Sequence, residues 1–282
     1  MKRLLLPLVT LGFSLLGFAA ETWTPLFNGK DFTGWETYLA APAAPAGPGA
    51  RPPQPIGVNK DPHGAFSVVQ VDGTPAIRIA GDIPGGIATL SSYSNYHLRL
   101  QFRWGARRTD AKPSQLANSG LLFHGHGRHG EGNGRWLPSH QFQIQPGNCG
   151  DYIAMGDSAA LIPAQAVEAK KRVFAPGAEP ILFSNTPPDV PRCGKAGGME
   201  RPSGEWNTIE LYCYGDRFLQ VVNGVPVLEG RSRMRAPSGS AEPLDAGRLE
   251  LQAEGWEIFF RDVEIAPLTA WPEELAAGAG KK

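Results

Sequence analysis

The chain has 282 residues, with 27 basic and 27 acidic side chains and a hydrophobic content of 41%. Balanced charge argues against a polyanion such as nucleic acid as a partner, while the hydrophobic content is enough to build a core. The 35 glycines and 26 prolines favour turns and long loops over long helices.

Residues 1–20 have the features of a secretory signal peptide. Lys2 and Arg3 form a basic start, residues 4–18 form an apolar run, and small residues follow at 19–20. We therefore expect a secreted or periplasmic protein. No later segment is apolar for long enough to suggest a membrane span.

The mature chain is expected to form one β-sandwich domain over 21–270, followed by a tail over 271–282. Insertions rich in proline and glycine are expected near 40–60 and within 160–202. The long loop over 176–202 is a candidate lid, since long ordered loops in compact domains are often functional.

The three cysteines are expected to have different roles. Cys213 lies within an expected strand and is interpreted as a small core residue. Cys149 and Cys193 both lie in loops rich in glycine and proline. Because export permits disulfides, we predict a Cys149–Cys193 bridge.

Alternation of apolar and polar residues predicts strands throughout the chain, and an Asn223-Gly224 pair predicts a tight hairpin turn. Helical periodicity is limited to two short segments, 161–173 and 271–277. The pattern indicates an all-β antiparallel sandwich. The expected strands are 65–71, 76–80, 96–104, 119–124, 140–145, 206–214, 217–222, 248–253 and 257–265.

The strand expected at 140–145 places amides on one face. Phe142 and Ile144 point toward a core, while Gln141 and Gln143 point the other way. Each amide offers two donors and an acceptor, which suits a ligand covered in hydroxyl groups, and a small saccharide is the expected partner. A solvated outer face is the alternative interpretation.

A second strand, 248–254, places Glu250, Gln252 and Glu254 on one face, opposite its leucines. We expect this face and the amide face of 140–145 to border a common hollow, with all five polar side chains as candidate saccharide ligands. The alternative is again a solvated outer face.

Four segments, taken together, resemble the 3-keto-disaccharide hydrolase family: 23–35, 136–151, 204–224 and 249–265. The most specific phrase is Leu-Phe-Asn-Gly-Lys-Asp near the start of the first segment. The resemblance extends from about Trp23 to Leu268. It implies a concanavalin- or laminin-G-like jelly roll and an activity on oxidised glycosides.

The chemistry implied by the resemblance begins at C2 of a 3-keto sugar. The keto group makes the C2 proton acidic, so a base removes it, a cation or hydrogen-bond donor holds the enolate oxygen, and the aglycone leaves from C1. Water then adds to the unsaturated sugar.

The chain departs from the family pattern at two positions. Gln141 stands where the family usually carries a glutamate, and Gln220 stands where it often carries a histidine. The family's recurring Gly-Asp pair falls on Gly150 and Asp151, so the resemblance implies a site role for Asp151. Capping of a turn is the alternative role for Asp151.

His124, Arg103 and Asp151 are the candidate catalytic residues, as base, oxyanion holder and proton donor or metal ligand. His126, in a histidine-rich tract, and Trp136, which could stack on a sugar ring, are candidate binding residues. The alternatives are a flexible polar loop for the histidines and a solvated side chain for Arg103. No cofactor is predicted; a divalent metal is left open, although no loop has the acidic density of a calcium site.

Three other functions remain open from the sequence. A conventional glycosidase would need two carboxylates, which Asp151, Glu250 and Glu254 could supply. A non-catalytic carbohydrate-binding module would use the same fold and amide face without a base. The third function is that of a protein–protein adhesion domain, which no feature of the sequence specifically supports.

Overall fold

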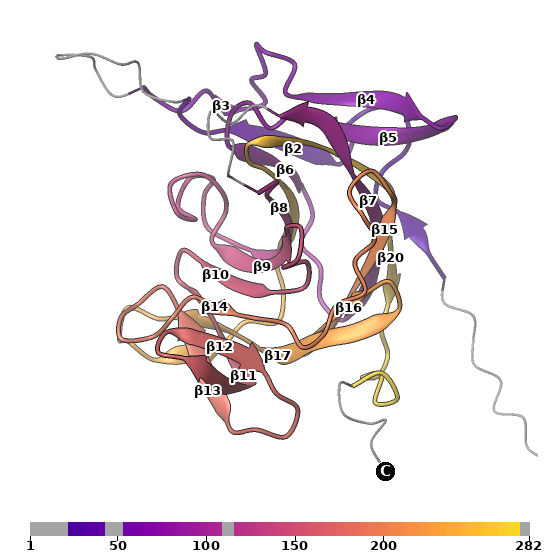
Figure 1. Ribbon diagram of the computed structural model, residues 1–282. Coiled ribbons are helices and arrows are strands. Elements are labelled where there is room, and N and C mark those ends of the chain that lie inside the picture. Colours follow the sequence, from indigo (N-terminus) through magenta and orange to yellow (C-terminus); the bar gives the residue numbers. More distant parts are fainter. Residues whose placement is uncertain (1–21, 43–52, 109–115, 277–282) are drawn as a thin grey trace, which may run out of the picture.

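The computed structural model describes residues 22–42, 53–108 and 116–276, which form two antiparallel β-sheets packed face to face (Figure 1). The predicted signal peptide and most of the proline-rich stretch near 40–60 lie outside the described residues.

The large sheet has 12 strands among the described residues and curves around the small one (Figure 1). Its main order is β12-β11-β17-β16-β15-β7-β20-β5-β4, with β1 beside β20, β13 beside β11 and β18 beside β17. The strands are β1 (Thr24–Pro25), β4 (Phe66–Val71), β5 (Thr74–Ile79), β7 (Tyr96–Arg108), β11 (Ser158–Glu168), β12 (Lys171–Phe174), β13 (Pro180–Ser184), β15 (Asn207–Tyr214), β16 (Arg217–Val222), β17 (Val225–Arg235), β18 (Ala241–Pro243) and β20 (Trp256–Pro267).

The small sheet has eight strands in the order β14-β10-β9-β8-β19-β6-β2-β3. β9 and β19 therefore flank β8, which brings the two polar faces predicted from the sequence within one strand of each other. The strands are β2 (Trp35–Leu39), β3 (Gly57–Val58), β6 (Gly85–Thr89), β8 (Ser119–Gly125), β9 (Ser139–Ile144), β10 (Tyr152–Met155), β14 (Arg192–Cys193) and β19 (Arg248–Ala253).

The hydrophobic core lies between the sheets. Phe142 and Leu251 from the small sheet belong to the same buried cluster as Leu100 and Phe102 from the large sheet. Because side chains alternate along a strand, the polar residues between these apolar positions are directed to the outer face of the small sheet. The core thus fixes which side chains can form a site there.

The predicted all-β class is confirmed, and each of the nine predicted strands is present within a few residues of its expected ends. The Asn223-Gly224 turn is also confirmed, since the two residues have φ of 49° and 79° and join β16 to β17. These positive angles are those that a type I′ turn requires.

The two predicted helices are wrong. β11 and β12 form a hairpin over 161–173, in which Ile162 and Ala164 are buried and Pro163 between them is partly exposed. That alternation has the period of a strand. Residues 271–276 form turns, and the part of the chain that the structure describes contains no helix, hence none that could span a membrane.

The predicted disulfide is also wrong, because Cys149, Cys193 and Cys213 are free, buried thiols. Cys193 lies on β14 opposite Tyr152, and its Sγ is within 3.6 Å of the Gly194 carbonyl oxygen. Burial raises the pKa of Cys193 and Cys213 to about 12, so these thiols stay protonated as small core residues.

Candidate functional site

A hollow of about 330 Å³ opens on the outer face of the small sheet, and we call it the amide groove. The lining side chains come from β9, β10 and β19, from the residues next to β8 and β19, and from the β8–β9 loop. The two polar faces predicted from the sequence therefore border one hollow. The lining residues are Asn118, Asn133, Arg135, Trp136, Gln141, Gln143, Ile153, Met155, Gln252 and Glu254.

The floor of the amide groove is a chain of amides that bond to one another across strands. Gln141 Nε2 donates to Gln252 Oε1 at 2.9 Å and also to Gln143 Oε1, and Gln143 Nε2 donates to Asn118 Oδ1 at 2.8 Å. The three glutamines are at most 2% exposed. Their mutual bonds hold the amides in fixed positions, because a buried amide without partners would be costly.

Gly120 makes room for this amide chain. It lies on β8 opposite Gln143, between the strands that carry Gln141 and Gln252. A Cβ at this position would come within 2.7 Å of Gln141 Nε2 and 3.0 Å of Gln252 Oε1. The amides can meet above β8 because this residue has no side chain.

Glu254 and Arg135 provide the charges of the amide groove. Arg135 donates to Glu254 Oε1 at 2.9 Å, while Asn118 and Gln252 donate to Oε2 at 2.6 and 3.1 Å. Burial raises the pKa of Glu254, although Arg135 and Asn118 act against the rise. A carboxylate with increased proton affinity thus lies beside a guanidinium group that is 46% exposed.

The β8–β9 loop supplies one wall of the amide groove. Trp136 Nε1 donates to the Gly85 carbonyl at 2.7 Å, and its ring packs in a small cluster with Leu122 and Met155. The ring is only 4% exposed. Trp136 therefore lines the groove, but it presents little surface on which a sugar could stack.

Glu250 shares the outer face with Gln252 but is covered by the β8–β9 loop. Its Oε2 accepts a hydrogen bond from the Leu137 N–H at 3.1 Å, and the side chain is fully buried. Burial raises the pKa of Glu250 to about 8, so it is mostly protonated at neutral pH. Glu250 lies behind the wall, and Glu254 is the carboxylate that lines the hollow.

His124, predicted as the base, lies on the other side of the small sheet. Its backbone has a φ of 51°, and the β8–β19 register shifts next to it. This bulge reverses the expected orientation, so the ring lies in the core 6.1 Å from Tyr96 and 6.0 Å from His140, measured between ring centroids. Burial lowers the pKa of His124 to about 4.

Arg103 and Asp151, the other predicted catalytic residues, do not line the amide groove. Arg103 lies on β7 of the large sheet, where it pairs with Asp72 at 2.8 Å and lies over the Trp206 ring. Asp151 accepts hydrogen bonds from Arg192 at 2.6 and 2.8 Å and from the Lys195 N–H at 3.0 Å. Both residues have structural partners that local sequence could not reveal.

The histidines that follow β8 lie in the β8–β9 loop, where carboxylates of other segments hold them. His126 Nε2 lies 2.8 Å from Asp157 Oδ1, and His129 Nε2 lies 2.9 Å from Glu36 Oε1. Neither histidine lines the amide groove. Among residues 22–42, 53–108 and 116–276, no group of three or more His, Cys, Asp or Glu side chains is arranged to hold a metal ion.

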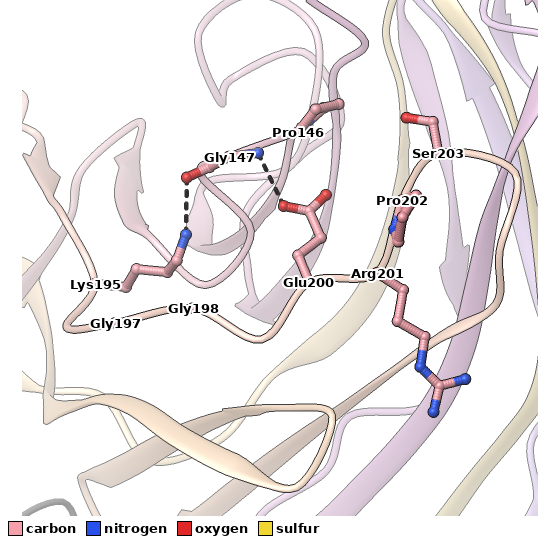
Figure 2. A pocket seen from close by; sticks show the side chains of 9 residues that line it. All are labelled: Pro146, Gly147, Lys195, Gly197, Gly198, Glu200, Arg201, Pro202 and Ser203. Carbon is pink, nitrogen blue, oxygen red and sulfur yellow. Dashed lines mark hydrogen bonds between the residues drawn. The ribbon is translucent and has the colours of Figure 1, made fainter.

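A second hollow, of about 540 Å³, lies where the predicted lid loop meets the turn after β9 (Figure 2). Lys195 Nζ donates to the Gly147 carbonyl at 2.8 Å, and the Gly147 N–H donates to Glu200 Oε2 at 2.9 Å. None of the predicted site residues lines it, and no residue of 176–202 lines the amide groove. The loop therefore does not cover the groove.

Sequence reasoning did not single out Asn118, Asn133 or Arg135 as site residues. Asn118 has the same strand parity as Gly120, so alternation could have found it. Arg135 precedes Trp136 in a loop, where no periodic signal fixes the direction of a side chain. Asn133 is held by the Asn185 amide at 3.3 Å, a partner far along the chain.

Comparison with solved structures finds matches at low sequence identity. Two crystal structures of candidate glycosyl hydrolases from Parabacteroides distasonis are 18% and 20% identical, with TM-scores of 0.47 and 0.48. The first match covers 87% of this chain and 94% of the other, and the second covers 88% and 100%. A carbohydrate binding module, CBM66 from Bacillus subtilis, is 10% identical with a TM-score of 0.40, covering 71% and 91%.

The comparison with curated proteins finds no match. A family model, however, matches residues 22–266, which is nearly all of the described chain. The model is that of the 3-keto-alpha-glucoside-1,2-lyase-like domain. Its extent agrees with the resemblance found in the sequence, and the chain belongs to this carbohydrate-active family.

Proposed function

We propose that this protein is an exported enzyme that cleaves 3-keto-glycosides or 3-keto-disaccharides in the amide groove, by elimination followed by hydration. The observation that carries the proposal is the pairing of one partly buried carboxylate, Glu254, with one half-exposed guanidinium, Arg135, beside a floor of fixed amides. Elimination from a 3-keto sugar needs one base and one group that stabilises an enolate.

In the proposed reaction, Glu254 is the base that removes the C2 proton. The electron pair of the C2–H bond forms the enolate, whose C3 oxygen is held by Arg135. Return of the C3 carbonyl forms the C1–C2 double bond and breaks the bond from C1 to the aglycone oxygen, which takes up a proton. Addition of water across C1 and C2 then gives the free 3-keto sugar.

The bonds to Glu254 are compatible with this role. Oε2 is fixed by Asn118 and Gln252, whereas Oε1 is bonded to Arg135. Arg135 is the exposed partner of the three, so it can turn from Oε1 to a substrate oxygen and leave Oε1 free to accept the proton. The raised pKa of Glu254 makes it a stronger base than an ordinary surface carboxylate.

The test is turnover of a 3-keto-glucoside by the Glu254→Gln variant. Glutamine keeps the shape of the side chain but cannot take a proton, so we expect turnover to fall roughly 100- to 10,000-fold. The matched control is Glu264→Gln, since Glu264 is also paired with an arginine, Arg99, at 2.5 Å, but on the large sheet. Wild-type turnover in Glu254→Gln would disprove the role of Glu254.

A non-catalytic carbohydrate-binding module is the second candidate. It is favoured by Gln141, which stands where the family usually carries a glutamate, and by the mutual bonding of the amides. Thermal unfolding with plain and 3-keto disaccharides separates the two functions. A plain disaccharide that raises the Tm, with no product from the 3-keto sugar, would favour the binding module.

A further inference from the structure

A separate hollow of about 590 Å³ lies on the outer face of the large sheet, and none of its lining residues lines the amide groove. β16 and β17 supply Arg217, Glu229 and Arg231, and the segment after β20 closes one end with Trp271. Leu161, on β11, contributes to an apolar edge. We call this hollow the arginine hollow.

The charges around the arginine hollow balance one another. Arg231 and Arg233 are 2.7 and 2.5 Å from the two oxygens of Asp216, and Arg217 is 3.2 Å from Glu273. Glu229 adds a third carboxylate to these three guanidinium groups. The hollow therefore has no excess positive charge with which to select an anion.

Two polar atoms at the arginine hollow have no partner among the described residues. One is the acceptor Oε2 of Glu229, and the other is the donor Nε1 of Trp271. Trp271 is only 9% exposed, with the Arg217 guanidinium 4.0 Å from its ring centroid. A buried acceptor and a buried donor that lack hydrogen-bond partners favour a ligand that supplies both donors and acceptors.

A hydroxyl group has both abilities, and neutral saccharides carry several of them next to apolar C–H surface. The apolar edge of the hollow, which includes Pro163 and Pro180, can cover such a surface. The free N–H groups of the arginines can donate to ring and hydroxyl oxygens. Carboxylate, guanidinium and apolar edge together match a neutral sugar unit better than an anion or a hydrocarbon.

We infer that the arginine hollow is a second, non-catalytic binding site for a neutral oligosaccharide, in which Glu229 accepts hydrogen bonds from sugar hydroxyls. Because the two hollows lie on different sheets, binding here is independent of chemistry in the amide groove. The site would hold a second oligosaccharide molecule, or a distant part of the saccharide that is bound in the amide groove.

The test is isothermal titration of the full protein with maltohexaose, cellohexaose and, as the anionic probe, hexagalacturonate. We expect at least one neutral probe to bind the wild type and the Gln252→Ala groove variant equally. We also expect Glu229→Ala to weaken that binding at least roughly tenfold. The matched control is Glu242→Ala, an exposed carboxylate on β18 of the same sheet.

Turnover of a 3-keto-glucoside is measured in parallel, and Glu229→Ala should leave it unchanged. This readout keeps failure of the second site distinct from failure of the proposed enzyme activity. Three results would overturn the inference: neither neutral probe binds, binding is lost in Gln252→Ala but not in Glu229→Ala, or hexagalacturonate alone binds. Circular dichroism of Glu229→Ala shows whether the variant is folded.

Discussion

The two faces of the β8–β9 pair both bury polar side chains, yet their surroundings differ. On the inner face, His124 and His140 lie among aromatic rings, with His140 Nδ1 2.9 Å from the Tyr152 hydroxyl. On the outer face, Gln141 and Gln143 bond to other amides and border a hollow. A buried polar side chain is therefore a candidate site residue only where it borders a hollow.

The two faces also respond to protons in opposite ways. Burial lowers the pKa of His124 and His140, so protonation of either ring destabilises the folded state. Burial raises the pKa of Glu250 and Glu254, so the outer face retains protons that exposed carboxylates would lose. The unfolding free energy should thus contain two pH-dependent contributions of opposite sign.

The largest expected effect comes from Glu250→Gln. The folded state keeps the Glu250 proton up to a pKa of about 8, whereas the unfolded state loses it near 4.5, so rising pH lowers the free energy of unfolding across this range. Glutamine removes the titration and can still accept the Leu137 hydrogen bond. The difference in unfolding free energy between the variant and the wild type should therefore grow by about 4 kcal/mol, in favour of the variant, from pH ~5 to pH ~8.

Urea unfolding at several pH values measures this gain. Glu242→Gln, on the exposed strand β18, is the control that changes a carboxylate without changing a buried one. If the wild-type and Glu250→Gln stability curves run parallel from acid to alkaline pH, Glu250 is not the buried, protonated group described above.

His124→Asn tests the inner face, where the pH dependence of stability has the opposite sign. The ring has a folded-state pKa of about 4 against an unfolded value of 6.5, so stability is present above 6.5 and is lost as pH falls through this range. The His124 contribution should be about 3 kcal/mol. Asparagine tolerates the φ of 51° and does not titrate.

Acid unfolding followed by fluorescence should show a smaller loss of stability in His124→Asn, with part of the loss remaining because His140 still titrates. Turnover at neutral pH should stay within roughly threefold of wild type, since the ring lies in the core. A 100-fold loss of turnover in a folded His124→Asn protein would restore His124 as the base.

Gly120→Ala should affect the outer face more weakly. The new Cβ would press on Gln141 and Gln252, which would then lose their present geometry. We expect roughly tenfold lower turnover and about 1–2 kcal/mol lower stability. Gly194→Ala is the control, because its Cβ would meet its nearest neighbour at an ordinary 3.4 Å. Equal turnover in the two variants would show that the amide geometry does not matter.

Alternation along the strands was sufficient to predict the sandwich and the outer direction of Gln141, Gln143 and Gln252. It failed at His124, where a single residue with positive φ reverses the side chain. It could not show that the β8–β9 loop covers Glu250, because that depends on a contact between residues 113 positions apart. Strand parity assigns a side chain to a face but not to a cavity.

The same limit explains Asp151 and the predicted helix. Asp151 follows β9 in sequence, but its carboxylate is bonded to Arg192, 41 residues away, and does not line the groove. The segment 161–173 contains three alanines, which favour a helix, yet pairing with β17 and β13 holds its first part as a strand. Tertiary pairing overrides local propensity in such short segments.

The smallest expected effect is that of Arg103→Ala. Its comparison variant is Arg135→Ala, which removes an arginine from the amide groove. Each arginine pairs with a carboxylate, Arg103 with Asp72 at 2.8 Å and Arg135 with Glu254 at 2.9 Å, but only Arg135 lines the amide groove. Removing Arg103 should cost less than about 1 kcal/mol of stability and leave turnover within roughly twofold. Removing Arg135 should lower turnover by roughly 100-fold, because the enolate loses its cation.

Parallel assays of turnover and Tm for the two variants separate the sheets directly. The expected pattern is a loss of turnover in Arg135→Ala at nearly constant Tm, with both quantities nearly unchanged in Arg103→Ala. If Arg103→Ala instead lost tenfold or more in turnover at an unchanged Tm, the chemistry would depend on the outer face of the large sheet. Since that face is separated from the amide groove by the core, the groove could then no longer be the complete active site.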